Sequence, residues 1–533
     1  MNKNMRKQLK YPFFLTAILI SSLLATCKKS AIIGEDPYAG GKAPLGVTFG
    51  TASPSPASGP AGSTVVFQVK GLLKYGSNFD FLISNQKTTI LNVTDTTITI
   101  KVPTDISSGI SSIKLGGQVF FGPRFAITGN ISIDAGFGAG NGTDGPIYSA
   151  YEFNQGYMIL GSFLRYEGSY YPGIAFVNSL GGIGNLNTRD GMNLGGSLLS
   201  VARLASGKFI IAGNYNLYYR KGGIGNITRI NSDGSLDAVT VNVINQIPEI
   251  PSNGLDTVPA FNGAFRGQQT IIKTFVTSDN KVIAVGNINS YTTIDYTKST
   301  RLSRAYTFKN IFTVARMNEN GILDETYNYG PTSTGANALV NDAFMQTDGK
   351  IVLVGNFTKF NGVNANYIVR LDKNGQPDAT YQTGTGANGN INTVQYNSTS
   401  RRIMVTGNFT TFNNKACPGI AMLMEDGSLD ANFKFGDVTG GNVNFARSLK
   451  NGKVLVAGTF DQYNGVSRPG FLLLNADGSA LQTFNHLGTF SGQIQQVIET
   501  TSTIGAPAII LLGYIRKFDD KNVNNIVKVE IKN

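Results

Sequence analysis

Gly349-Lys-Ile-Val-Leu-Val-Gly-Asn-Phe357 is the phrase that recurs most clearly along this chain. Close copies begin at Gly207, Arg401 and Gly452, and weaker copies cover 157–161, 281–286 and 508–513. One glycine ends the apolar run of each copy, and these marker glycines are Gly161, Gly213, Gly286, Gly355, Gly407, Gly458 and Gly513. Their spacings of 52, 73, 69, 52, 51 and 55 residues match the period of a β-propeller blade or a similar β-repeat.

Each run before a marker glycine is continuously apolar, so its residues need cover on both faces, as in a blade that packs between two neighbours. The glycine itself fits a place where two backbones converge. A second strand and a turn follow. The repeat then ends in a short segment with the pattern Asp-x-x-aromatic, as at Asp378 and Tyr381, and we call this segment the coda. From residue 130 onward this unit resembles the delta-60 repeat of bacterial β-propellers.

The two ends of the repeat region are complementary. Ile133-Asp-Ala-Gly-Phe137 is a coda without strands before it, whereas the last repeat stops at 526–531 without a coda after it. An open solenoid needs caps, whereas a ring can build one blade from both termini. We therefore expect residues 133–137 to pair with 527–531 in a seven-bladed propeller over 129–533. One misjudged weak copy would make the number of blades six or eight.

Residues 43–128 contain short apolar runs separated by turns, which predicts an immunoglobulin-like β-sandwich. The phrases Pro56-Ala-Ser-Gly-Pro-Ala-Gly and Val93-Thr-Asp-Thr-Thr-Ile-Thr-Ile-Lys-Val-Pro103 resemble a TIG (IPT) domain. Such modules act mostly as spacers, with some binding cases. The predicted fold class is therefore all-β, with a sandwich followed by a propeller.

Residues 1–26 have the pattern of a signal peptide, because basic residues precede an apolar run, 11–25, that is too short to span a bilayer. Leu24-Ala-Thr-Cys27 resembles a lipobox, so we expect lipid on Cys27 and a linker over 27–42; an incidental cysteine in an ordinary secretory signal is the alternative. The chain is similar to lipoproteins of Bacteroidetes-type bacteria, which implies an outer-membrane anchor. We expect cell-surface display, with the periplasmic face as the alternative because Lys28 and Lys29 follow the cysteine.

The composition excludes some classes of partner. The net charge is +12 before the signal peptide is removed, charged residues make up 15% of the chain, and no long basic run is present, so nucleic-acid binding is not indicated. Only Cys417 is left once Cys27 carries lipid, and no intrachain disulfide can form.

No catalytic residue is assigned. His486 is the only histidine and is interpreted as a surface or packing residue, and Cys417 has no evident base partner. A carboxylate pair of a polysaccharide-degrading enzyme needs no histidine. Its candidates are Glu152, Glu167, Asp295, Asp342 and Asp461.

No metal or other cofactor is expected. The Asp-x-Asn/Asp-Gly turns, as at 372–375, suggest calcium ligands, but the twelfth-position Glu of an EF-hand is missing. A tight hairpin requires the same residues, because its central positions need positive φ. The recurring Phe357-x-x-Phe360-Asn-Gly phrase is likewise interpreted as part of the blade scaffold.

Two insertions, at about 239–268 and 289–310, explain the long spacings and are placed in loops, where function concentrates. The second combines tyrosines, which stack on sugar rings, with arginines, which meet carboxylates, and so suits an acidic polysaccharide or a protein partner. The ligand-binding residues are predicted to be Tyr291, Tyr296, Arg301, Arg304 and Tyr306. A solvated loop is the alternative, and the absence of Trp weakens the glycan interpretation. The next candidate site is formed by Tyr166, Tyr170, Tyr171, Tyr218 and Tyr219.

Together these observations predict a membrane-anchored binding protein that captures polysaccharide for a neighbouring uptake system. A structural or adhesive protein that binds a cell-surface partner is the alternative. A polysaccharide-degrading enzyme is the third hypothesis.

Overall fold

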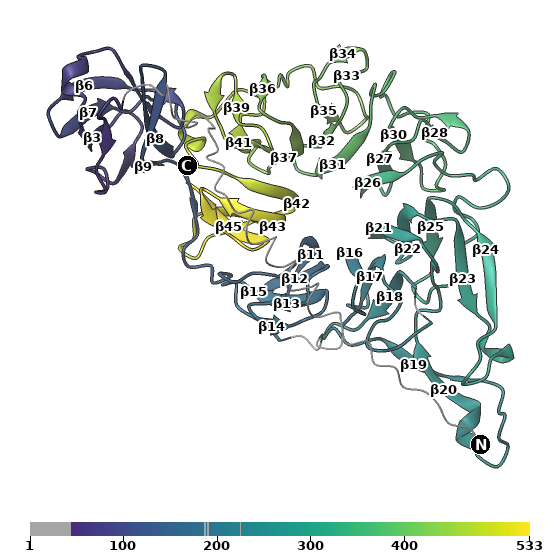
Figure 1. Cartoon of the computed structure of the whole chain (residues 1–533). Helices are drawn as coiled ribbons and strands as arrows, with labels where there is room; N and C mark the ends of the chain where they lie inside the picture. Colours follow the sequence, from purple (N-terminus) through teal and green to yellow (C-terminus); the bar gives the residue numbers. More distant parts are fainter. Residues whose placement is uncertain (1–43, 186–187, 189–190, 224, 533) are drawn as a thin grey trace, which may run out of the picture. The chain divides into compact units, whose positions relative to one another are not determined.

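The computed structural model describes residues 44–185, 188, 191–223 and 225–532 (Figure 1). The signal peptide, Cys27 and the linker lie outside the described residues. Contacts group Phe49–Asn533 into one compact unit, which the following paragraphs describe. In the described part, helical structure is confined to the 3-10 turns η1 (Leu73–Tyr75), η2 (Pro251–Gly254), η3 (Tyr296–Lys298) and η4 (Gln482–Phe484). None of these is long and apolar enough to cross a bilayer.

The strands before residue 129 form a β-sandwich, as expected. One sheet has the order β3–β7–β6 and the other β2–β9–β8–β4–β5. Alternate residues of β3 are buried, and Phe67 lies 4.8 Å from Phe81 and 6.3 Å from Phe125 of the other sheet, ring centre to ring centre. The strands are β1 (Thr48–Phe49), β2 (Ser58–Pro60), β3 (Thr64–Lys70), β4 (Asp80–Ile83), β5 (Gln86–Lys87), β6 (Thr89–Val93), β7 (Thr97–Lys101), β8 (Gly109–Leu115) and β9 (Gln118–Thr128).

The repeats form seven blades in the described residues, each an antiparallel sheet. Blade one consists of β11 (Ile147–Phe153), β12 (Gly156–Gly161) and β15 (Ile174–Asn178). Blade two consists of β16 (Ser197–Arg203), β17 (Phe209–Asn214) and β18 (Ile227–Ile230). Blade three consists of β21 (Thr270–Val276), β22 (Val282–Asn287) and β25 (Val314–Met317). Blade four consists of β26 (Val340–Met345), β27 (Ile351–Gly355) and β30 (Ile368–Leu371). Blade five consists of β31 (Ile391–Asn397), β32 (Arg402–Gly407) and β35 (Ile420–Met424). Blade six consists of β37 (Val443–Ser448), β38 (Val454–Gly458) and β41 (Phe471–Leu474). Blade seven is β42 (Ser491–Thr501), β43 (Pro507–Phe518), β45 (Ile526–Ile531) and β10 (Ile131–Ile133), with β44 (Lys521–Asn522) at its side.

Small hairpins connect the second and third strands of several blades. They are β13 (Arg165–Tyr166) with β14 (Ser169–Tyr170), β28 (Lys359–Phe360) with β29 (Val363–Asn364), β33 (Thr411–Phe412) with β34 (Lys415–Ala416), and β39 (Gln462–Tyr463) with β40 (Val466–Ser467) and β36 (Val438–Thr439). The insertions form longer hairpins, β19 (Ala238–Asn242) with β20 (Leu255–Pro259), and β23 (Ser290–Ile294) with β24 (Tyr306–Asn310).

Apolar packing between neighbouring blades holds the ring. Alternate residues of β27 face opposite neighbours: Ile351 and Leu353 pack with blade three, whereas Val352 and Val354 pack with blade five. This two-sided burial explains why the runs are continuously apolar. A similar cluster lies between each pair of neighbours, including blades seven and one.

The ring closes through both ends of the repeat region, as the complementary ends predict. Ile131 pairs with Ile531 and Ile133 with Val529, so the ladder begins two residues before the expected coda. The Asp134 N–H continues the ladder by donating to the Lys528 carbonyl, at 2.9 Å. The outer strand of blade seven is thus β10, which ends at Ile133, the first residue of the expected coda.

A steric constraint recurs at every marker glycine. Each glycine pairs with the residue that starts a β-bulge in the first strand of its blade. A Cβ on any of the seven would lie 2.0 to 2.2 Å from a carbonyl oxygen in that strand or of the residue just before it, far inside contact distance. None of the seven has positive φ, so close approach alone requires glycine, as expected.

The codas fasten the outer strands by ion pairs. Asp378 accepts from Lys350 at 2.8 Å and from Arg370 at 2.9 Å, and the Tyr381 ring lies 4.7 Å from the Arg370 guanidinium. Burial by itself would raise the pKa of Asp378, but hydrogen bonds from Lys350 and Thr380 and the charge of Arg370 hold it well below its ordinary value. Asp237, Asp324 and Asp430 hold cations in the same way.

Replacing a marker glycine by alanine should destabilise the ring. In Gly407→Ala the methyl group would meet the Asn390 carbonyl oxygen, so β31 and β32 would have to separate. We expect the free energy of unfolding to fall by about 1–3 kcal/mol in chemical denaturation. The control is Gly140→Ala, because Gly140 has open space around its Cβ position and no positive φ. Equal losses in both variants would contradict the steric explanation.

The coda ion pair predicts a pH dependence. Because Asp378 has a lowered pKa in the folded state, its stabilisation is complete above the ordinary Asp pKa and is lost as pH falls toward the folded-state pKa. Asp378→Asn should lower the free energy of unfolding by about 3 kcal/mol at pH 7. This difference in free energy of unfolding between the variant and the unchanged protein should become smaller below about pH 4. Asp348→Asn is the control, since Asp348 is half exposed and 4.0 Å from Lys350. A difference in free energy of unfolding that does not vary with pH would contradict the role of the ionised Asp378 carboxylate.

Candidate functional site

The first strands of the blades surround the centre of the ring (Figure 1), and each carries one bulged residue. The bulge follows from the marker glycine opposite it, which lets the two backbones approach. The bulged residues are Tyr148, Leu199, Ile272, Asn341, Asn392, Asn444 and Gln495. Blades one to three therefore contribute apolar or aromatic side chains, and blades four to seven contribute amides.

A cavity of about 280 Å³ lies at this ring, and residues of all seven blades line it. The bulged residues except Asn444 are part of the lining, together with Lys273, Asp342, Thr393, Gln395, Phe445, Gln493 and Ile494. The bulged residues of blades one to three thus offer apolar surface, and those of blades four, five and seven offer groups that both donate and accept hydrogen bonds. We call this cavity the channel site.

The charges of the channel site come from different blades. The Lys273 ammonium lies 3.2 Å from an Asp342 carboxylate oxygen. The same carboxylate accepts from the N–H groups of Ala343, at 2.9 Å, and Val394, at 3.0 Å. Asp342 therefore connects blades three, four and five.

Of the five carboxylates considered for catalysis, only Asp342 lines the channel site. Glu167 accepts from the N–H groups of Asn141 and Gly142, and Asp295 caps η3 by accepting from Thr297. The channel site therefore does not offer a pair of these carboxylates. Whether the chain is an enzyme stays untested.

The predicted ligand-binding residues lie on a different part of the molecule, an arm built from the β19–β20 and β23–β24 hairpins (residues 238–259 and 290–310; Figure 1). Tyr291 contradicts the prediction, because its side chain is 1% exposed and its hydroxyl donates to the Gly321 carbonyl. Tyr166, Tyr218 and Tyr463 make the same bond in their blades, with Gly181, Gly234 and Gly478. Tyr291 is thus a scaffold residue, fixed by the neighbouring turn.

Three of the other predicted residues are engaged within the arm or its base. Arg304 forms an ion pair with Asp256 and lies 5.9 Å from the Tyr296 ring centre. Arg266 covers the Tyr306 ring at 4.3 Å. Arg301 is exposed. The arm residues are thus near one another but face different contacts, and a ligand role for Tyr296, Arg301, Arg304 and Tyr306 stays a prediction.

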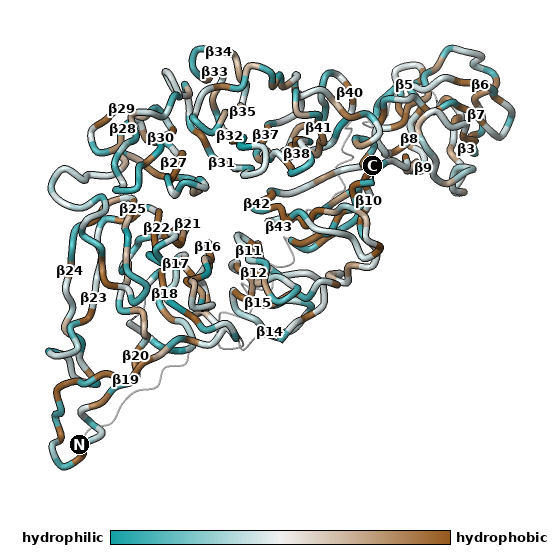
Figure 2. The backbone as a smooth tube through the Cα atoms, turned by 180° about the vertical axis from the view of Figure 1, so that it is seen from behind, coloured by the Kyte–Doolittle hydropathy of each residue, from teal (hydrophilic) through white to brown (hydrophobic). Residues whose placement is uncertain are grey.

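The end of the arm exposes apolar side chains, visible as hydrophobic stretches beyond β19 and β20 in Figure 2. Leu302 is 94% exposed. Ile244, Ile247, Ile250 and Leu255 are also exposed. An exposed apolar cluster of this kind is typical of an interaction surface. The sequence placed an interaction here through its tyrosines, whereas the exposed groups are aliphatic.

Most of the second-choice tyrosines are also structural. Tyr166, Tyr171 and Tyr218 are buried. Burial raises the pKa of the Tyr218 hydroxyl well above its ordinary value. Tyr170 is 47% exposed, on β14, and is available to solvent.

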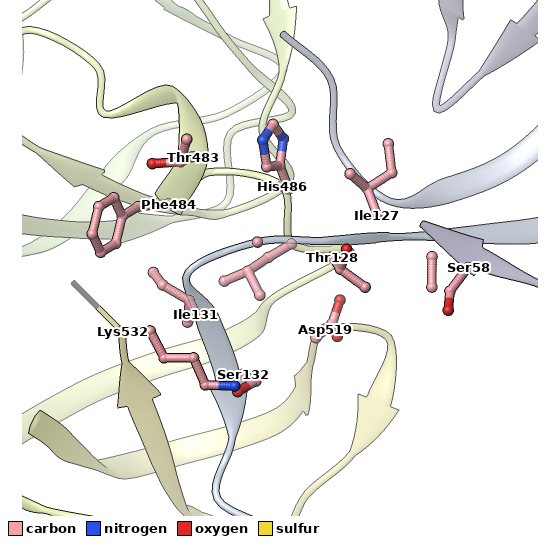
Figure 3. A pocket seen from close by; sticks show the side chains of 13 residues that line it. Ser58, Ile127, Thr128, Ile131, Ser132, Thr483, Phe484, His486, Asp519 and Lys532 are labelled. Atoms are coloured by element: carbon pink, nitrogen blue, oxygen red, sulfur yellow. The ribbon is translucent and has the colours of Figure 1, made fainter. Parts of the chain in front are cut away.

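A second cavity, of about 240 Å³, lies where the sandwich meets blades six and seven (Figure 3). His486 lines it, and Nδ1 of its ring lies 2.6 Å from the Ile106 carbonyl oxygen. Burial lowers the pKa of His486. Beside it, the Ser108 N–H donates to the His486 carbonyl at 2.8 Å. His486 is thus a packing residue of this junction, one of the two roles expected for it.

The Asp/Asn-Gly turns are occupied by their own backbone. Asp372 Oδ1 accepts from the N–H groups of Asn374 and Gln376, both at 2.9 Å. Asp426 and Asp477 accept similarly from Ser428 and Ser479. In the described ranges no three metal-ligating side chains gather. Cys417 is half-buried, and burial raises the pKa of its thiol.

Comparison with known proteins gives two family matches. Residues 23–123 match a family described as a domain of unknown function, DUF5008. Residues 346–381, 400–433 and 449–480 match a β-propeller family described as a domain of unknown function, DUF5122. These three segments lie in blades four to six. None of the curated proteins compared with the chain matches it.

Solved structures with a related arrangement are distant. The WD40 β-propeller domain of Doa1 is 13% identical, with a TM-score of 0.38 over 75% of this chain and 96% of that one. YCF48 bound to D1 peptide is 8% identical, with a TM-score of 0.38 over 76% and 96%. A protein of unknown function from Bacteroides thetaiotaomicron is 12% identical, with a TM-score of 0.24 over 91% and 98%. The propeller assignment rests on the strand pairing and the DUF5122 match.

The scaffold role of Tyr291 is testable through its hydroxyl group. Tyr291→Phe removes the bond to the Gly321 carbonyl and leaves a buried acceptor unpaired, so we expect a loss of about 1–2 kcal/mol in the free energy of unfolding. Arg301→Ala, at an exposed position of the same arm, should change it by less than about 0.5 kcal/mol. Thermal and urea denaturation measure both. An unchanged stability of Tyr291→Phe would return Tyr291 to the candidate ligand residues.

Proposed function

We propose that this chain is a binding protein that captures polysaccharide at the channel site for a neighbouring uptake system. The observation that carries the proposal is the division of the ring of bulged residues into an apolar half with Tyr148 and an amide half. A sugar ring has apolar C–H faces that stack on aromatic groups and hydroxyl edges that need donors and acceptors. Pockets that hold such ligands combine apolar walls with a few placed polar groups.

The N-terminal part of the proposal concerns location. Lipid on Cys27 would hold the chain in the outer membrane, with display at the cell surface. Residues 43–128, which resemble a TIG domain, would then act as a spacer between the anchor and the ring. Support for this part comes from the signal-peptide and lipobox patterns alone.

The channel site is tested by removing groups from both halves of its ring. The double variant Tyr148→Ala, Asn392→Ala should weaken retardation in native gels cast with polysaccharide at least tenfold, equivalent to about 1.4 kcal/mol. Its melting temperature should change little, because Asn392 is exposed and Tyr148 is only partly buried. The control is Tyr170→Ala, an exposed tyrosine outside the ring. Unchanged retardation of the double variant would move the glycan site away from the ring.

The anchor is tested in cells. Cys27→Ser removes the thiol that would take the lipid, so the protein should pass from the membrane fraction to the soluble fraction and lose labelling by radioactive palmitate. Protease treatment of intact cells should cleave the unchanged protein, since display at the surface exposes it. Palmitate labelling that survives the substitution would contradict lipidation at Cys27.

A second candidate function is attachment to a protein partner through the end of the arm. The exposed aliphatic side chains favour it, above all Leu302. The two functions are separable, because Leu302→Asp should abolish crosslinking to a partner on cells and leave retardation by polysaccharide unchanged.

A further inference from the structure

The strand β37 places an arginine next to the channel site. Phe445 lines the cavity, and Arg447 follows two residues later on the same face of the strand. The Arg447 Nη1 group donates to the Gln395 side-chain oxygen at 3.4 Å, and Gln395 also lines the cavity. Arg447 is not itself part of the lining, but its guanidinium contacts Gln395, which is.

Arg447 lacks the pairing that other buried arginines of the ring have. Arg229, Arg316 and Arg370 each form an ion pair with a coda aspartate. Within the described ranges, by contrast, no carboxylate oxygen lies within 4.0 Å of Arg447, and its Nε is buried without a hydrogen-bond partner. The side-chain oxygen of Asn444, the bulged residue of the same strand, is also buried and unpartnered.

An arginine in this state lowers the stability of the fold, because Arg447 is partly buried and its buried Nε–H makes no hydrogen bond. Burial lowers the pKa of Arg447, and the charge of Glu499 opposes this. The other cation of the channel site, Lys273, is already neutralised by Asp342 at 3.2 Å. Arg447 thus lies next to a lining residue, Gln395, as a cation without an ion-pair partner in the described residues, and an incoming anion can pair with it.

We propose that Arg447 is the subsite for the carboxylate of an acidic sugar in the channel site. This rests on the proposed function and names its substrate class, a uronate-containing polysaccharide. The guanidinium fork can donate two parallel N–H bonds to a carboxylate, which a single ammonium group cannot do. A sulfate ester offers similar oxygens, so the test must include one.

The test compares matched ligands on the full-length protein. Polygalacturonate should retard the unchanged protein in native gels at least tenfold more strongly than its methyl-esterified form, in which the carboxylate charge is removed. Arg447→Gln should abolish this difference and leave weak binding of the ester, and Arg447→Lys should restore it in part. Arg301→Gln, an exposed arginine outside the cavity, is the control. Carrageenan, a sulfated polymer, should be retained more weakly than polygalacturonate.

Stability gives a readout that a merely structural arginine would not give. Because Arg447→Gln removes a partly buried charge that has no ion-pair partner, its melting temperature should equal or exceed that of the unchanged protein while binding of polygalacturonate falls. Monomeric galacturonate should raise the melting temperature of the unchanged protein, whereas galactose should not, and Arg447→Gln should abolish the galacturonate effect.

Three results overturn different parts of the scheme. Equal retention of polygalacturonate and its ester, unchanged in Arg447→Gln, would overturn the anion subsite and leave glycan capture intact. Retention of no polysaccharide would overturn the proposed function, and absence of a galacturonate-induced rise in melting temperature would then overturn the subsite as well. Preferential retention of carrageenan would overturn the carboxylate assignment.

Discussion

A carbonyl oxygen occupies the place of a missing Cβ at each of the seven marker glycines, and the rest of the ring depends on this close approach. At each marker glycine the second strand of a blade packs closely against the first strand, at the point where the first strand has its β-bulge. The bulge adds one residue, and at least six of these added residues border the channel site. The contact that allows a blade to form therefore also creates the variable positions around the ring centre. Scaffold and candidate site have the same physical origin.

Much of the fold could be predicted, because the properties that specify it are repeated in the sequence. The continuous apolar runs predicted that the strands are buried on both faces. The coda at 133–137, which has no strands before it, predicted that the two ends of the repeat region meet and close the ring. Tyr291 was assigned wrongly because the third repeat was aligned only as far as Gly286. Gly286-Asn-Ile-Asn-Ser-Tyr291 continues the same phrase as Gly355-Asn-Phe-Thr-Lys-Phe360, which makes Tyr291 the counterpart of Phe360. The insertion begins after this scaffold position.

The channel site could not be predicted from residue types, since its bulged residues share a position and no common chemistry. In the second, third, fourth and sixth repeats that position lies fourteen residues before the marker glycine. The spacing is a usable signal once the bulge is known, but a bulge depends on strand register, which local propensity does not specify. To predict that Lys273 pairs with Asp342, and that Arg447 has no carboxylate partner, one must know which blades are neighbours.

The pairing of β10 with β45 makes the last blade a joint between residues 400 positions apart, Ile131 and Ile531. Until the final strand has been synthesised, β10 has no partner and β42 and β43 lack a finished neighbour. Such an edge is open to aggregation and to proteases. Closure of the ring thus acts as a check of completeness: a chain that ends before β45 leaves β10 unpaired and the ring open, which exposes the incomplete chain to removal by proteases.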